Sequence, residues 1–205
     1  MGHMTNTSKL NEAIDIYGAG IPFGAKDFLD CGNYDAIRKQ LIRKSLQGEI
    51  IRILNGVYCK PEYSKLTGEL IPADMEKVAE YLARRYGWQV VPSTQLALNY
   101  LGLSSQVPVK FEFLSSGPYR DFNIQNKLLS FKHTANKNLF NITPESALLI
   151  QALNGLGKNG INEDDLRKIS RCFSRKQLET ALKESSNNKV WIYQTIKKLL
   201  EEKDD

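Results

Sequence analysis

The pattern of apolar residues over the first sixty positions predicts three helical segments followed by two strands. Apolar side chains recur every three or four residues over 8–17 and 34–47, as on one face of a helix, and in the second helix Ile37, Leu41 and Ile42 are expected to face a core. A short helical segment is expected between the two helices, at 25–29. Strands are expected over 49–53 and 57–60, joined by a turn that contains Asn-Gly. This order of elements is that of a winged helix-turn-helix domain.

A second apolar pattern begins after the polar stretch 61–70, which we interpret as a connection between domains. A helix is expected over 75–86, and β segments over 109–114, 119–124 and 127–131 form a small sheet. The predicted fold class is α+β, with an N-terminal winged helix-turn-helix and a C-terminal mixed α/β domain that ends in helices. The predicted parts are a tag remnant and tail, the winged-helix domain and the C-terminal domain, over 1–8, 9–66 and 67–205.

Local signals place several helices in the last third of the chain. One is expected over 145–153 and closed by Asn154 and Gly155. The acidic run 163–165 is expected to start another, because negative charge offsets the dipole at a helix N-terminus. Residues 174–177 form a capping-box pattern that opens a further helix.

Composition narrows the class of protein. With 41% hydrophobic and 25% charged residues, the 205-residue chain has the make-up of a folded globular protein. It has no apolar window of the roughly 18 residues that cross a membrane and no signal-like start, so we expect a cytoplasmic protein without a membrane partner. Cys31, Cys59 and Cys172 are far apart and lack metal-binding spacing, which predicts reduced structural thiols, no metal and no cofactor.

Charge is concentrated on the helix expected at 34–47 and on the strands after it. The whole chain carries a formal charge of +5, and residues 36–60 alone hold six basic side chains against the single acid Glu49. An ordinary solvated helix face would be the simplest interpretation of such a run. In a winged-helix context, however, the helix can enter the major groove while its cations neutralise phosphates, so we expect promoter or operator double-stranded DNA as a partner.

The expected DNA-binding residues divide by their place on this helix and hairpin. Residues near the start of a recognition helix approach base edges, which nominates Asn33, Tyr34 and Arg38, although Asn33 is also the expected helix cap. Contacts to the DNA backbone are expected from the remaining basic and amide side chains of the surface, namely Lys39, Arg43, Lys44, Arg52, Asn55 and Lys60.

A family resemblance strengthens this interpretation. The stretch Gly-Glu-Ile-Ile-Arg-Ile-Leu-Asn-Gly-Val-Tyr at 48–58 resembles the wing of AbiEi-type antitoxins, the repressor halves of bacterial abortive-infection toxin–antitoxin operons. Pro-Ser at 92–93, Asn-Tyr-Leu-Gly-Leu-Ser-Ser-Gln-Val-Pro at 99–108, Ser-Gly-Pro at 116–118 and Lys-His-Thr at 132–134 follow in family-like order.

The resemblance implies a negatively autoregulating antitoxin. Its winged-helix domain would bind repeats in its own promoter, and its C-terminal domain would neutralise a toxin that resembles nucleotidyltransferases. The candidate toxin contacts near the sheet are Arg120, Lys132 and His133. A regulator of the same architecture whose C-terminal domain dimerises or senses a small ligand is the alternative, and the operator sequence and oligomeric state stay open.

Enzymatic motifs are absent from the sequence. It contains no G-x-x-x-x-G-K-[ST] loop, and the spacing G-x-G-x-x-G occurs only at 155–160, where it follows an expected helix rather than a strand. A nucleotidyltransferase would carry Gly-Ser followed by two aspartates, whereas Ser116-Gly117 is reversed here and Asp121 stands alone. His133 lacks a nucleophile and an orienting acid, so we interpret it as a hydrogen-bonded residue at a strand end. We expect no catalytic residues, and a nuclease targeted by its winged helix is the less favoured third class.

Overall fold

The computed structural model describes residues 6–106 and 108–203, and it has the predicted α+β composition. The chain forms two compact units: the first takes the chain up to Leu82 together with Asn123–Lys127, and the second takes Ala83–Phe122 and the chain from Leu128 onward. Of the tag remnant and tail expected over 1–8, residues 1–5 lie outside the described residues, and residues 6–8 belong to a helix rather than a tail. None of the described helices is long and apolar enough to cross a membrane.

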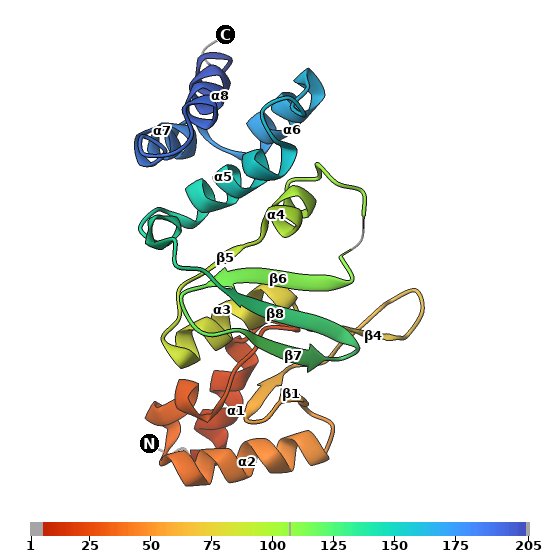
Figure 1. The fold of residues 1–205 in the computed structure, drawn as a ribbon. Helices are drawn as coiled ribbons and strands as arrows, with labels where there is room; N and C mark the ends of the chain where they lie inside the picture. Colours follow the sequence, from red (N-terminus) through yellow and green to blue (C-terminus); the bar gives the residue numbers. More distant parts are fainter. Residues whose placement is uncertain (1–5, 107, 204–205) are drawn as a thin grey trace. The chain divides into compact units, whose positions relative to one another are not determined.

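The first unit has the order of elements that the apolar pattern predicts. Its elements are α1 (Asn6–Ile16), the 3₁₀ helix η1 (Ala25–Cys31), α2 (Tyr34–Leu46), β1 (Ile51–Leu54) and β2 (Val57–Cys59) (Figure 1). β1 and β2 pair antiparallel as a wing, with Arg52 opposite Tyr58. Phe23 forms an isolated antiparallel β-bridge to Tyr58, which the sequence pattern did not reveal. The N–H and C=O of the two residues exchange hydrogen bonds of 2.8 Å.

The core of the first unit explains which helix faces are buried. Tyr17, Phe23 and Phe28 meet edge to face, with ring centroids 5.1 to 5.5 Å apart. Ile37 and Leu41 of α2 are buried against this cluster, as predicted. Ile42 was also expected in the core, but it is 40% exposed. The buried stripe of α2 continues instead from positions 37 and 41 to position 44, one helical turn further on.

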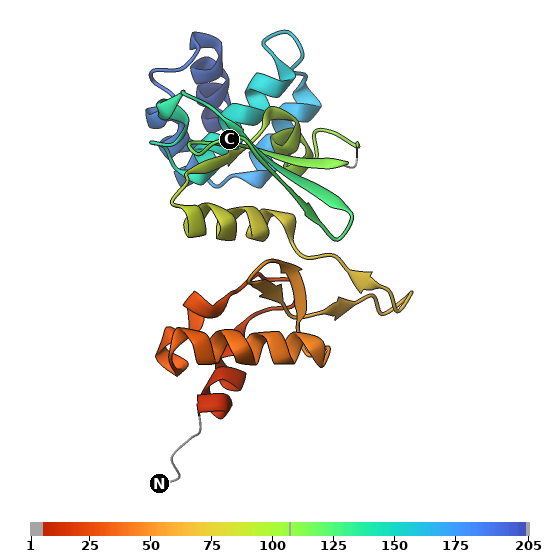
Figure 2. The same ribbon diagram turned by 60° about the horizontal axis from the view of Figure 1, so that its bottom comes forward.

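Residues 61–70 contain more structure than the plain connection that we expected. β3 (Glu62–Tyr63) and β4 (Leu70–Ile71) pair antiparallel, with Tyr63 opposite Leu70, and form a hairpin that projects from the rest of its unit (Figure 2). The hairpin closes through a turn in which the Ser64 hydroxyl accepts hydrogen bonds from the backbone N–H groups of residues 66 and 67. Its apolar tip residue Leu66 is 97% exposed.

The helix α3 (Met75–Tyr86) has the bounds that its amphipathic pattern predicts. It begins in the first unit and ends in the second, since the division between the units falls after Leu82. Asp74 caps it by accepting hydrogen bonds from the N–H groups of residues 76 and 77, at 3.0 and 3.1 Å.

Most of a mixed four-stranded sheet belongs to the second unit. Its strands are β5 (Val90–Pro92), β6 (Lys110–Ser115), β7 (Arg120–Ile124) and β8 (Lys127–His133), in the order β5-β6-β8-β7. β5 runs antiparallel to β6, and β6 runs parallel to β8 with Phe113 opposite Phe131. Gln125 and Asn126 both have positive φ, at 46° and 67°, as the tight turn between β7 and β8 requires.

Helices make up the rest of the second unit (Figure 1). They are α4 (Thr94–Tyr100), η2 (Lys137–Leu139), α5 (Pro144–Leu156), α6 (Glu163–Cys172), α7 (Arg175–Glu184) and α8 (Val190–Glu201). The acidic run does begin α6, and the capping box between Ser174 and Gln177 does open α7. α5 packs against α4, α7 and α8 around a core that includes Leu149, Leu153 and Ile196.

The expected end of α5 at Asn154 and Gly155 is wrong. The helix continues to Leu156 and ends at Gly157, whose φ of 72° is the left-handed conformation that glycine adopts readily. Gly155 lies inside the helix because α4 approaches it closely: a Cβ there would lie 2.9 Å from the Cδ1 of Leu98. This glycine therefore serves packing between helices rather than termination.

Candidate nucleic-acid interface

The exposed side of α2 carries three basic side chains. Arg38, Lys39 and Arg43 are all exposed. Within the described part of the chain, Lys39 and Arg43 form no side-chain hydrogen bond or ion pair. Arg38 lies 3.7 Å from Asp35 in a pair whose side chains are 51% and 76% exposed, so the pair is weak and easily exchanged for a phosphate. This face is therefore free to meet a polyanion.

The start of α2 presents the polar residues that the sequence nominated for base edges. The Asn33 side-chain oxygen accepts a hydrogen bond of 2.9 Å from the Ala36 N–H, as expected of a helix cap. The amide N–H groups of Asn33 stay available for an acceptor. Tyr34 is 47% exposed, so its ring is not sequestered in the core.

The wing places Arg52 and Asn55 side by side. An Arg52 guanidinium N–H donates to the Asn55 side-chain oxygen at 2.6 Å, and a second donates to the Leu54 carbonyl at 3.4 Å. These bonds hold the guanidinium over the turn and leave its other N–H groups for an outside acceptor. Both residues are exposed, so the wing tip carries one oriented cation.

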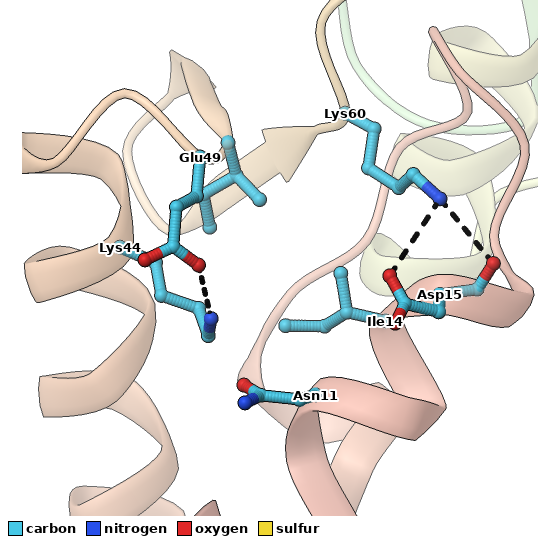
Figure 3. Close-up of a pocket in the computed structure, with 7 residues that line it drawn as sticks. Asn11, Ile14, Asp15, Lys44, Glu49 and Lys60 are labelled. Carbon is cyan, nitrogen blue, oxygen red and sulfur yellow. Dashed lines mark hydrogen bonds and ion pairs between the residues drawn. The ribbon is translucent and has the colours of Figure 1, made fainter. Parts of the chain in front are cut away.

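Two of the expected phosphate contacts have other partners. Lys44 is only 9% exposed and its ammonium group is bonded to the Glu49 carboxylate. Lys60 is half-buried and its ammonium group donates to the backbone oxygen of Asp15 at 3.3 Å, with the Asp15 carboxylate at 4.0 Å. Both lysines face a cavity of about 290 Å³ that Asn11 also lines (Figure 3).

The geometry of Lys44 does not fit the phosphate contact expected of it. The residue continues the buried stripe of Ile37 and Leu41 at helical spacing, and that spacing was the signal in the sequence that could have revealed its burial. Its charge is already compensated by Glu49, so we leave Lys44 out of the interface. Lys60 ties β2 to α1 and is a weaker candidate than Arg43 for the same reason.

The three expected toxin contacts lie on two faces of the sheet in the second unit. The Arg120 guanidinium lies over the rings of Tyr86 and Phe122, at 4.8 and 5.3 Å from their centroids. His133 shares that face by strand alternation with Phe131, and its Nδ1 donates to the Gly117 carbonyl at 2.9 Å. The prediction of a hydrogen-bonded histidine at a strand end is thus confirmed.

Lys132 alternates to the opposite face of β8. Its ammonium lies 2.8 Å from the Glu112 carboxylate, which also pairs with Lys110 at 3.3 Å. The hydrogen bond and charge of Glu112 raise the pKa of Lys132, so this lysine stays protonated at all physiological pH values. The structure thus brings Arg120 and His133 onto one face and separates Lys132 from them.

A family model matches residues 9–200, which is most of the chain. The chain belongs to DUF6088, a family of unknown function. The DUF6088 match covers parts of both compact units, including the helical end after residue 161, which the motif resemblance did not reach. A search among curated proteins found no match to the chain.

The described residues of this DUF6088 member offer no evident metal site. Among them, no three His, Cys, Asp or Glu side chains converge on a point that could hold an ion. Cys31, Cys59 and Cys172 are free thiols, as expected. The basic face of α2 and the Arg52–Asn55 pair of the wing bring exposed cations and an amide together, and such groups can bind an anion.

Proposed function

We propose that this protein is a DNA-binding transcriptional regulator that represses its own promoter. α2 would lie in the major groove, with Asn33, Tyr34 and Arg38 near base edges. Lys39 and Arg43 would contact phosphates, and the β1–β2 wing would place Arg52 and Asn55 on the adjacent backbone. The observation that carries the proposal is the exposed face of α2, whose cations Lys39 and Arg43 are unpaired within the described part of the chain.

Charge and position support this proposal together. Unpaired surface cations gain most from DNA, since each neutralised phosphate releases condensed counterions. A helix face that contacts only solvent often pairs its cations with carboxylates three or four residues away in the same helix. Arg167–Glu163 and Lys168–Asp164 of α6 are pairs of this kind. On α2, among the described residues, the one such ion pair joins Asp35 to Arg38.

We propose in addition that the regulator is the antitoxin of an abortive-infection operon. Support comes from the order of motifs shared with AbiEi-type antitoxins, which extends from the wing to Lys132-His133-Thr134. The partner would be a nucleotidyltransferase-like toxin, and the aromatic-backed Arg120 with His133 is the surface we nominate for it. Lys132, paired with Glu112 on the other face, is the weaker nominee.

Binding of the protein to its own promoter tests the DNA-binding proposal. We expect the full-length chain to bind a duplex from the region upstream of its gene and the double variant Lys39→Ala/Arg43→Ala to bind it at least tenfold more weakly. The matched control is Lys176→Ala, which removes an exposed lysine from α7 in the second unit. Equal loss in the control, or no loss in the double variant, would refute the assignment of the surface.

A further inference from the structure

The second unit contains a cavity whose wall is dominated by primary amides. It has a volume of about 270 Å³ and lies between the 134–141 segment, the C-terminal half of α5 and the loop that joins α7 to α8. Six amide side chains come from these three segments, those of Asn136, Asn138, Gln151, Asn154, Asn187 and Asn188. Each amide presents a donor and an acceptor in one plane, so the wall is suited to a ligand with the same alternation.

Gln151 is the residue of this cavity that most clearly indicates a binding site. It is 4% exposed, yet its side chain makes no hydrogen bond within the described part of the chain. Its amide atoms are not among the buried polar atoms that lack a partner, so they stay accessible from the cavity, where water or a ligand can satisfy them. Gln151 lines the cavity, so a group bound there can supply the missing partners.

The remaining wall constrains the charge of the ligand. Lys189 contributes an ammonium group that donates to the Asn154 side-chain oxygen at 2.9 Å, and among the described residues no carboxylate lines the cavity. A negative group is therefore favoured near Lys189. Leu139 and Ile150 supply an apolar part of the wall, against which a flat ring can pack.

We propose that this cavity binds an adenine nucleotide, with the base paired to the Gln151 amide and the phosphate near Lys189. An amide side chain is the complement of adenine, which presents N6 as donor beside N7 as acceptor, whereas guanine presents two acceptors there and prefers Arg or Lys. The cavity volume of about 270 Å³ lies just below the range of about 300–1,000 Å³ typical of sites for drug-sized ligands, so a single nucleotide is the largest ligand that we expect it to hold. The nucleotide could be free or part of a single strand, and both share this chemistry.

Calorimetric titration of the full-length protein tests the proposal without reference to promoter binding. We expect AMP to bind and GMP to bind at least fivefold more weakly. Gln151→Met keeps the side-chain volume and removes the hydrogen bonds, so it should weaken AMP binding roughly 5- to 100-fold, the effect of one bidentate base contact. The matched control is Gln194→Met, at an exposed position on α8.

Further titrations separate the parts of the ligand. Lys189→Met should weaken AMP binding and leave adenosine binding unchanged, because only AMP carries a phosphate. Tighter binding of oligo(dA) than of AMP would support the site and assign it to a strand, and equal or weaker binding would support it and assign it to the free nucleotide. The melting temperature of Gln151→Met shows that the variant folds, and it should be no lower than that of the wild type.

Three results would overturn the proposal. One is the absence of heat on titration with millimolar AMP and oligo(dA) alike. Another is equal AMP affinity in Gln151→Met and Gln194→Met, which would place any binding elsewhere. The third is equal affinity for AMP and GMP. If the proposal holds, the second unit acts as a nucleotide sensor, which is a form of the ligand-sensing regulator considered from the sequence.

Discussion

Lys44 illustrates how the surroundings of one residue decide what its charge can do. From the sequence it belongs to a basic run, but in the fold it continues the buried stripe of α2 and is bonded to Glu49. The carboxylate stabilises a cation that has lost most of its water. The pair therefore contributes to the stability of the first unit rather than to the positive electrostatic potential of its surface. Arg43, one residue earlier, is exposed and keeps its charge for a partner.

Replacing Glu49 by glutamine should lower the free energy of unfolding. The change preserves the shape of the side chain but leaves the buried ammonium of Lys44 without its counter-charge. We expect a loss of about 1–3 kcal/mol, towards the lower end because the Glu49 side chain is 50% exposed. Chemical denaturation measures it, with Glu62→Gln at an exposed site of β3 as control. An unchanged midpoint would show that the pair contributes nothing.

The three cysteines should differ sharply in reactivity. Burial raises the pKa of the Cys59 thiol to about 11 from its ordinary value of 9.0. Cys172 is exposed and should react first with a thiol reagent at pH 8, while Cys59 should react only as fast as the protein unfolds. Rapid labelling of Cys59 in the folded Cys172→Ser variant would contradict this burial.

The raised pKa of Cys59 also predicts how the stability of the fold changes with pH. The neutral thiol of Cys59 is favoured in the fold, so its contribution to stability is complete below pH 9 and declines as pH rises from 9 to 11. Denaturation midpoints of the wild type should therefore fall more steeply over this range than those of Cys59→Ala. Parallel curves for the two proteins would contradict the shift.

At the scale of elements, the hairpin of β3 and β4 lies where a plain connection was expected. Its tip is exposed and short of contacts, as shown by Leu66 at 97% exposure. Exposed loop tips are the usual sites of proteolytic nicking. We expect brief trypsin treatment of the folded protein to cut first after Lys65. A first cut in the 134–141 segment instead would show that the hairpin tip is better protected than its exposure indicates.

Elements with strong local signals could be predicted from the sequence, and elements that depend on distant partners could not. The amphipathic pattern gave α3 its correct bounds, and the capping box placed the start of α7. The hairpin β3–β4 was missed because its strands are two residues each and carry no alternation. The end of α5 was misplaced because Gly155 looks like a helix terminator until Leu98 of α4 is seen against it.

In the candidate site, too, the features with local sequence signals could be predicted and those that depend on distant residues could not. The wing and the cap at Asn33 are local features, and both are present. The burial of Lys44 depends on the rotation of α2 against its core, and the pairing of Lys60 with Asp15 joins residues 45 positions apart. The amide-lined cavity assembles three segments of the second unit, none of which carries a recognisable motif alone.

At the scale of the whole molecule, the proposed roles belong to different units and should be separable by surface variants of the full chain. Lys39→Ala/Arg43→Ala should relieve repression of a promoter reporter and leave suppression of the neighbouring gene's toxicity intact. Arg120→Ala should do the reverse, because that residue lies in the second unit. If both variants lost both activities to the same extent while staying folded, the two roles would share one surface.

The central claim is that the exposed face of α2 binds DNA, and fluorescence anisotropy on operator and scrambled duplexes across a salt series tests it most directly. Arg43→Ala should weaken binding to both duplexes and reduce the log–log salt slope by roughly 0.9 for the lost phosphate contact. Arg38→Ala should weaken operator binding selectively, by about 1–3 kcal/mol if its contact is bidentate. Lys44→Met should leave the slope unchanged. Operator affinity and salt slope unaltered in both Arg43→Ala and Arg38→Ala would contradict the account.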